Sequence, residues 1–277
     1  MFFKTFELIK FRIIRFIEAN PQLNLLIYNN VGLFKFLLPH EKDFYGMLKV
    51  CKNKKNLAIL DIGANLGISS MGFRKLGFVN KIYAFEPNYD LYKNYLKKIN
   101  KNYQNIFTKN FALGNKNNSM IFYMPYYKSK CIHYFCTFDK KYLINSLKIT
   151  FPKIYKKIII KKKIIKCKKF DDINFDIKPH FIKIDTEGYD SLVLRGLKKT
   201  ISIYKPIILV EYNKEYFREV KKILSKYTAY IYDIENDKML KLNKKIINNK
   251  VARISKKNSL SIRNIYFLPK KYKFAQC

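Results

Sequence analysis

Two acidic residues and two glycines in the first third of the chain have the types and spacing of a ligand site. Asp61 stands in an apolar run, residues 57–62, that leads into Gly63-Ala-Asn-Leu-Gly67, and Glu86 ends a second apolar run. Such runs are typical of strands buried on both faces, and the glycines allow a tight turn under a ligand. A helix is predicted over residues 69–76. Strand, turn and helix together predict a nucleotide-like ligand, with Glu86 accepting hydrogen bonds from its ribose.

The residues of the turn narrow the class of ligand that it could bind. A dinucleotide fingerprint needs a third glycine three residues after the second, and Ser70 stands there instead. The carboxylate of Asp61 would repel a pyrophosphate but suits a ligand that bears an ammonium and a sulfonium. The residues expected to bind this ligand are Asp61, Gly63, Asn65, Gly67 and Glu86.

A lysine and a carboxylate alternate along a later apolar segment, residues 181–185. The two-residue period of a strand places Lys183 and Asp185 on one face. An unpaired buried charge is costly, so Lys183 must have a carboxylate partner or face the cavity. Asp185 is the expected partner, and Glu187 lies just beyond it.

Four sequence blocks occur in a fixed order along the chain. They are Asp61-Ile-Gly-Ala-Asn-Leu-Gly67, Ala84-Phe-Glu-Pro87, Phe181-Ile-Lys-Ile-Asp-Thr-Glu-Gly188 with Val193-Leu-Arg-Gly196, and Pro206-Ile-Ile-Leu-Val-Glu211. Together they resemble the FkbM family of class I methyltransferases, which use S-adenosylmethionine. The resemblance runs from about Glu41 to Glu211.

The resemblance implies further site residues and an acceptor. Glu41 matches a glutamate that stands about twenty residues before the turn and helps close the cofactor pocket; an acidic residue in the first turn of a helix is the alternative. Asn110 and Ala112 match the strand end that touches adenine, although close packing would also explain Ala112. The implied acceptor is a hydroxyl of a sugar in a cell-surface glycan or its precursor, and the family also includes enzymes acting on small natural products.

Carboxylates at the ends of several predicted strands would meet at one edge of the sheet. Methyl transfer from a sulfonium requires alignment, and a base when the acceptor is a hydroxyl. Asp185 and Glu187 are the candidate bases, with Lys183 beside them. The alternative is structural: Lys183 paired with Asp185, and Glu187 in the first turn of a helix. A metal-assisted reaction through Asp185, Glu187 and Asp190 is a further alternative, but no histidine joins them and no metal is predicted.

The fold class predicted from these elements is α/β. We expect a Rossmann-like class I methyltransferase fold with a seven-stranded, mostly parallel sheet, helices on both faces and an antiparallel last strand. Residues 1–50 are predicted to form a helical segment and residues 51–277 the methyltransferase domain. The expected strands are residues 57–62, 81–85, 105–111, 181–185, 207–210, 229–233 and 262–268, with a lysine-rich loop over 243–258.

A lid-like insertion is predicted at about residues 125–168, after a short strand at 120–124. Its weak periodicity gives no clear elements, but its place in the fold puts it over the ligand side, where an acceptor would bind. Aromatic residues there could stack on sugars. His133 is interpreted as a surface histidine.

The chain is strongly basic, with a formal charge of +36 in 277 residues, yet only seven of its 56 basic residues are arginine. Abundant Lys, Asn, Ile, Tyr and Phe without Trp fit an AT-rich coding sequence, so a solvated lysine-rich surface is the favoured reading. An RNA methyltransferase is the alternative, but the chain lacks an Asn/Asp-Pro-Pro-Tyr/Phe motif and a Pro-Cys nucleophile. A glycan-binding protein that kept the fold without the reaction is a third reading, and the intact turn argues against it.

The five cysteines are scattered and odd in number, which favours a reducing, cytoplasmic setting. Cys131 and Cys136 lack a second pair or a histidine cluster that would complete a zinc site. Residues 1–20 alternate large apolar side chains with charges, which excludes a membrane span and predicts an amphipathic helix. That helix would pack on the protein or lie on the inner face of a membrane. The sequence does not predict an oligomeric state.

Overall fold

The computed structural model describes residues 39, 41–51, 58–175, 177–243 and 263–274, together with the single residues 9, 13 and 16. Apart from residues 9, 13 and 16, the predicted N-terminal helix lies outside this part of the chain, and so do His40 and almost all of the predicted lysine-rich loop. None of the helices in the described part is long and apolar enough to cross a bilayer.

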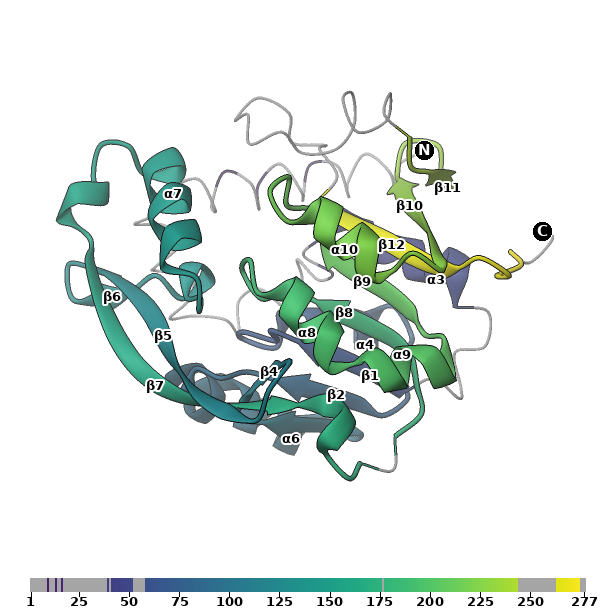
Figure 1. Ribbon diagram of the computed structural model, residues 1–277, viewed down its shortest axis with the longest axis horizontal. Helices are drawn as coiled ribbons and strands as arrows, with labels where there is room; N and C mark the ends of the chain where they lie inside the picture. Colours follow the sequence, from purple (N-terminus) through teal and green to yellow (C-terminus); the bar gives the residue numbers. More distant parts are fainter. Residues whose placement is uncertain are drawn as a thin grey trace.

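The main sheet is mixed and contains eight strands within the described residues, in the order β11-β10-β12-β9-β8-β1-β2-β3 (Figure 1). Its central strands β1, β8 and β9 are rich in Ile, Leu and Val and almost fully buried, as strands covered on both faces must be. The strands are β1 (Ala58–Ile62), β2 (Ile82–Phe85), β3 (Ile106–Lys109), β8 (Pro179–Ile184), β9 (Ile207–Glu211), β10 (Tyr227–Asp233), β11 (Lys238–Lys241) and β12 (Asn264–Pro269).

The prediction of seven strands is wrong in number. The expected antiparallel strand is β12, which pairs antiparallel with both β9 and β10. The extra strand, β11, forms a hairpin with β10. Strand β11 is only four residues long and begins and ends with lysine, so it gives almost no strand signal in the sequence. The turn before it is held by Asp233, whose carboxylate accepts hydrogen bonds from Glu235 N and Asn236 Nδ2.

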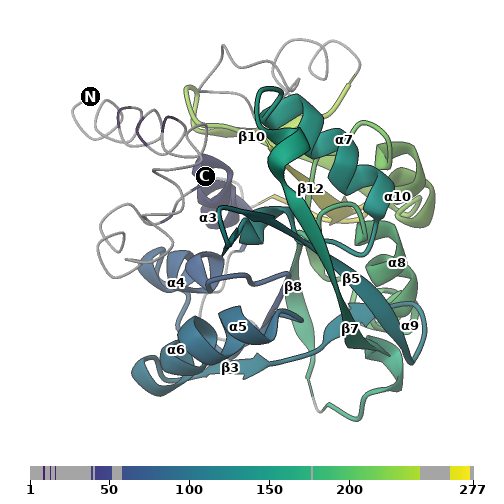
Figure 2. The ribbon, with the colours of Figure 1, turned by 90° about the vertical axis from the view of Figure 1, so that its left-hand side faces the viewer.

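Helices cover both faces of this sheet (Figure 2). Alternate residues of β1, β8 and β9 point to opposite faces and build two separate cores. One core packs against η2 (Lys42–Gly46), α3 (Met47–Val50), α4 (Ile68–Lys75) and α6 (Lys97–Asn102), and the other against α8 (Asp190–Gly196) and α10 (Phe217–Ile223). Helices α5 (Tyr89–Leu91) and α9 (Lys198–Tyr204) complete the two layers.

The insertion forms a second sheet of four strands, ordered β4-β7-β5-β6. Strands β5 (Asn118–Tyr127) and β7 (Ile159–Lys169) make a long antiparallel ribbon that carries α7 (Lys140–Thr150) at its far end (Figure 1). The short strands β4 (Ala112–Gly114) and β6 (Lys130–Cys131) flank it. Sequence analysis missed β7 because most of its side chains are exposed and lysine interrupts the alternation.

The insertion also has a small apolar core of its own. Its helix α7 begins at Asp139, whose side chain accepts a hydrogen bond from Tyr142 N. The buried members of this core are Ile132, Phe135, Leu143, Leu147 and Phe151. The lid is therefore a packed unit with a fixed shape.

Candidate active site

The glycine turn after β1 is fixed by its neighbours on both sides. Gly63 and Gly67 have φ angles of +79° and +77°, in the left-handed region that favours glycine. The amides of Gly63 and Ala64 donate to Phe85 O, which ties the turn to the end of β2. A Cβ atom on Gly63 would lie 1.8 Å from Asp185 O, so no side chain fits there.

Asp61 lies behind this turn and is fully buried. Its Oδ2 accepts hydrogen bonds from Ser69 Oγ at 2.7 Å and Ser70 Oγ at 2.6 Å, which attaches the start of α4 to β1. Its Oδ1 lies 3.5 Å from Lys183 Nζ. Asp61 therefore helps to organise the turn, and its role in ligand binding stays a prediction.

Glu86 and Asn65 face each other across the turn. Glu86 accepts hydrogen bonds from Asn65 N at 2.9 Å and from Asn88 N at 2.8 Å. Burial raises the pKa of Glu86 to about 7, although these two bonds oppose the shift. The side-chain Oδ1 of Asn65 is buried without a hydrogen bond in the described part of the chain. Both side chains can therefore take a ligand that brings hydroxyl or amino donors.

Asn110 and Ala112, expected at the adenine, have other surroundings. Asn110 Nδ2 donates to Glu86 O at 2.9 Å and Pro87 O at 3.2 Å, so this side chain holds the loop that follows β2. Ala112 is buried in β4 and pairs with Cys167 of β7. The structure brings Asn110 to the rim of the site through Glu86 and leaves the Ala112 side chain in the core, so its adenine contact remains a prediction.

Lys183 joins the two halves of the site. It is buried in β8, and its Nζ lies 3.2 Å from Asp185 Oδ2 and 3.2 Å from Gly63 O. Burial alone lowers the pKa of Lys183, but the charges of Asp185, Asp61 and Glu41 outweigh it and the net shift is upward. The ammonium therefore stays charged and offsets carboxylates on both sides of it.

Three carboxylates meet at the ends of β8 and β9. One oxygen each of Asp185, Glu187 and Glu211 lies within 4.8 Å of the others. Burial and then the charge of Asp185 raise the pKa values of Glu187 and Glu211 well above the usual range. Like charges this close cannot all ionise, so the cluster retains protons at neutral pH. Asp185 is the member paired with Lys183.

Glu41 and Asp43, which precede β1 in the sequence, are bonded to Asn264 of β12 beside this cluster. Asn264 Nδ2 donates to Glu41 Oε2, and Asn264 N donates to Asp43 Oδ2 at 2.8 Å. The charge of Glu41 acts on both Lys183 and Glu211. The structure therefore brings Glu41 to the edge of the acidic cluster, and Asn264, which sequence reasoning missed, holds it there.

The lid attaches to the cluster through Tyr142 and Thr137, and Tyr216 holds the start of the lid helix. Tyr142 of α7 donates its hydroxyl to Glu187 Oε2 at 2.9 Å, and Thr137 Oγ1 donates to Glu187 O at 2.7 Å. Tyr216 OH donates to Asp139 Oδ2 at 2.7 Å, at the N-cap of α7. These contacts fix the lid helix beside the acidic residues. Sequence reasoning missed Tyr142 because the lid gave no periodic signal.

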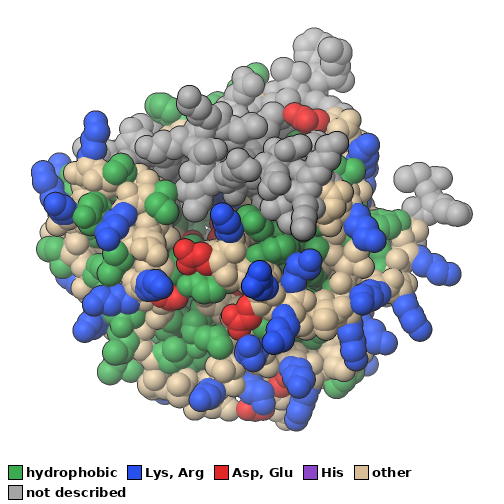
Figure 3. Space-filling view, turned by 45° about the horizontal axis from the view of Figure 1, so that its top comes forward, with side chains coloured by type: hydrophobic (Ala, Val, Ile, Leu, Met, Phe, Trp, Pro, Cys, Tyr) green, Lys and Arg blue, Asp and Glu red, His purple; other side chains and the backbone are tan. Residues whose placement is uncertain are grey.

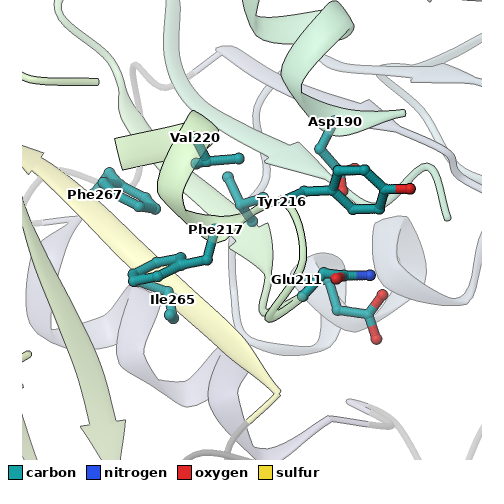
Figure 4. A pocket seen from close by; sticks show the side chains of 9 residues that line it. Asp190, Glu211, Tyr216, Phe217, Val220, Ile265 and Phe267 are labelled. Atoms are coloured by element: carbon teal, nitrogen blue, oxygen red, sulfur yellow. The ribbon is translucent and has the colours of Figure 1, made fainter. Parts of the chain in front are cut away.

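A pocket opens beside Glu211 at the ends of β9 and β12 (Figure 4). Its empty volume is about 230 Å³, part of it open to solvent. Polar groups of Asp190, Glu211 and Tyr216 lie at one end, and apart from these residues and Asn213 the lining side chains are apolar. The lining residues are Asp190, Val210, Glu211, Asn213, Tyr216, Phe217, Val220, Ile265 and Phe267.

Tyr142→Phe is expected to loosen the lid at the cluster. Loss of the hydroxyl removes a buried partner of Glu187 and should cost about 1 to 3 kcal/mol of stability. Tyr232→Phe is the matched control, because it removes a tyrosine–aspartate bond of 2.6 Å to Asp237 away from the site. Acceptor KM should rise several-fold only in Tyr142→Phe. Equal KM values in the two variants would contradict a role of Tyr142 at the site.

The sequence matches the Methyltransferase FkbM domain family over residues 61–232, more than half of the chain. This range includes the glycine turn, Glu86, the lid, Lys183 and the acidic cluster. No curated protein matches the chain significantly.

Several solved structures resemble this one at low sequence identity. A methyltransferase FkbM from Methylobacillus flagellatus KT is 16% identical with a TM-score of 0.48; the match covers 93% of this chain and 58% of that protein, so the chain spans little more than half of its length. A precorrin-6y C5,15-methyltransferase from Geobacter metallireducens GS-15 is 10% identical with a TM-score of 0.42, and the match covers 82% of this chain and 87% of that protein. A putative RNA methyltransferase from Pyrococcus horikoshii is 8% identical with a TM-score of 0.34, and the match covers 81% of this chain and 78% of that protein. At these scores the structures carry no argument about function.

Proposed function

The chain belongs to the FkbM family of methyltransferases, and we propose that it transfers a methyl group from S-adenosylmethionine to a hydroxyl group of a sugar in a cell-surface glycan or its precursor. The observation that carries this proposal is that the glycine turn and the acidic cluster lie at the same edge of the sheet. The glycine turn and Glu86 follow β1 and β2, while the acidic cluster follows β8 and β9, and Lys183 contacts both. This arrangement supports a cofactor site at the turn with a proton-accepting group next to it.

The residues at the turn suit S-adenosylmethionine. The buried, unbonded Oδ1 of Asn65 calls for a donor such as an amino group, and the Glu86 carboxylate has lone pairs left for ribose hydroxyls. Gly63 and Gly67 keep side chains out of the turn. When bound, this cofactor supplies an electrophilic methyl group on a sulfonium. Asn65, Glu86 and the backbone of the turn would hold it there.

The acidic cluster suits a neutral hydroxyl acceptor. Asp185 is the carboxylate paired with Lys183, and it retains partial exposure, so it is the residue we assign as the base. Glu187 and Glu211 hold protons and can donate hydrogen bonds to other hydroxyl oxygens of a sugar. Tyr142 positions Glu187, and Lys183 positions Asp185.

The same cluster argues against an RNA acceptor. The carboxylate of Asp185 would repel phosphate groups, and an RNA site needs a basic groove. Lysine and arginine side chains are scattered over the face drawn in Figure 3, between apolar and acidic ones. The high net charge would attract anionic molecules at long range. The basic side chains on this face do not gather into a groove that would bind RNA.

The proposal is tested by incubating purified protein with methyl-labelled S-adenosylmethionine and an extract of the source organism. Label is then counted in carbohydrate, lipid, nucleic-acid and protein fractions. Label in carbohydrate, or in lipid-linked carbohydrate, supports the proposal. Label in RNA would overturn the acceptor class, and absence of label despite cofactor binding would favour a non-catalytic glycan-binding protein.

Cofactor affinity is expected to depend on pH through Glu86. In the free protein its pKa is about 7, so below this pH Glu86 holds a proton. Ribose hydroxyls donate to the ionised form, so binding should tighten as pH rises through about 7 and then level off. Glu86→Gln should remove this dependence and weaken binding roughly 10- to 100-fold. Calorimetric titration of cofactor at several pH values measures both effects.

Glu219→Gln is the matched control for this prediction, since Glu219 forms an exposed pair with Arg195 away from the site. It should bind cofactor with the pH dependence of the unaltered protein. Affinity that is independent of pH in the unaltered protein would contradict the assignment of Glu86 to the ribose.

A further inference from the structure

The lid holds a second group of side chains with ligating atoms, outside the acidic cluster. They are Cys131, His133 and Cys136, and one ligand atom from each lies within 4.8 Å of the others. We propose that these three residues bind a zinc ion, with a fourth position left for water. The proposal concerns a metal in the lid and does not depend on the identity of the acceptor.

The spacing of the two sulfurs is that of zinc ligands. Cys131 Sγ and Cys136 Sγ lie 3.7 Å apart. Two thiolates on one tetrahedral zinc, each about 2.3 Å from the metal, stand about 3.8 Å apart. A disulfide would require about 2.05 Å. The pair is thus placed for a shared metal without any movement of the sulfurs.

Local structure holds the three residues in position. Cys131 ends β6 and pairs with Tyr126 of β5. His133 begins a short 3-10 turn, in which Cys136 N donates to His133 O at 3.2 Å. The residues between them, Ile132 and Phe135, are buried in the lid core. A metal would therefore bind a preformed turn and pay little ordering entropy.

The chemistry of the donor set favours zinc over a hard cation. Two thiolates and one neutral imidazole are typical zinc ligands, and with Zn²⁺ they form a neutral centre that suits a partly buried site. Cys136 is buried and Cys131 half-buried. The acidic cluster differs, because Lys183 already offsets the charge of Asp185 and the Tyr142 hydroxyl already donates to Glu187.

Asn88 connects this group to the cofactor side. Its Nδ2 lies 3.1 Å from His133 Nδ1, while its Oδ1 accepts from Asp90 N, so the amide donates to His133. Zinc on Nε2 would place the imidazole's proton on Nδ1, so Asn88 would have to turn its Oδ1 toward His133 when the metal binds. Asn88 N also donates to Glu86. Zinc would therefore fix the lid against the loop that follows Glu86.

Sequence analysis set Cys131 and Cys136 aside because it required a second pair or a histidine cluster. It also interpreted His133 as a surface residue. The signal was the spacing Cys-x-His-x-x-Cys within six residues, which a turn can bring to one point.

The test measures zinc on the full-length protein. After treatment with a chelator, the protein is titrated with ZnCl₂, dialysed, and its metal content determined. About one zinc per chain is expected. Cys131→Ser, Cys136→Ser and His133→Gln should each weaken binding at least tenfold, whereas Cys167→Ser, a buried thiol of β7 outside the group, should bind like the unaltered protein.

A second readout covers variants that fail to fold. In the unaltered protein, zinc should protect Cys131 and Cys136 from alkylation, as located by peptide mass, and cobalt(II) in its place should give a thiolate charge-transfer band. Zinc content far below one per chain would overturn the proposal. So would zinc that gives no protection at these two cysteines, or equal loss of zinc in Cys167→Ser.

Discussion

Asp185→Asn is expected to lower kcat for methyl transfer by about 10²- to 10⁴-fold, the usual contribution of a general base. Asparagine has the same shape but cannot accept the hydroxyl proton. The side chain keeps its place beside Lys183, which retains Asp61 as a partner. Cofactor affinity and the unfolding midpoint should change little, so the loss would lie in the chemical step.

Glu187→Gln is the control for this variant. Glu187 already holds its proton at neutral pH, and glutamine mimics the protonated group that faces Tyr142. Its kcat should fall far less than that of Asp185→Asn. Full activity in Asp185→Asn, or a larger loss in Glu187→Gln, would contradict the assignment and move the base to Glu187.

Lys183→Met is expected to have the largest effect on stability, about 3 to 5 kcal/mol, because it breaks a buried ion pair by removing one partner. Methionine fills similar space but leaves Asp61 fully buried without its cation and Asp185 without its ammonium at 3.2 Å. The free energy of unfolding, from urea titration, measures this loss. Cofactor binding should also weaken, because Lys183 Nζ donates to Gly63 O of the turn.

Lys49→Met provides the comparison for Lys183→Met. Lys49 and Asp237 form a shorter ion pair, with Nζ 2.7 Å from Oδ2, but the two side chains are 37% and 50% exposed. Pairs of this kind contribute about 0 to 1 kcal/mol. Similar losses in the two variants would show that Lys183 lacks the central electrostatic role assigned to it.

The parts of the site that the sequence predicts are those encoded locally. The apolar run before Gly63, the left-handed turn and the alternation of Lys183 and Asp185 are each contained in a few consecutive residues. The sheet order places them together, since β1 lies between β2 and β8. The pairing of Lys183 with Asp185 follows from the cost of burying an unpaired charge, and it is present at 3.2 Å.

The remaining features depend on contacts between distant residues. Tyr142 reaches Glu187 across 45 residues, and Asn264 reaches Glu41 across 223. No local pattern encodes either bond. The ribbon strand β7 is largely exposed, so its hydrophobic alternation is weak. The bonds from Ser69 and Ser70 to Asp61 were also missed, because serines give no such signal in the sequence.

The most direct test of the central claim is the chemical nature of the methylated product. Purified protein, ¹³C-methyl S-adenosylmethionine and the glycan fraction of the source organism are combined, and the product is examined by NMR. The account predicts a labelled methyl ether, with its methyl carbon coupled through oxygen to a sugar ring proton, and its absence with Asp185→Asn. A labelled methyl group on nitrogen or carbon, or on a nucleic-acid base, would contradict it.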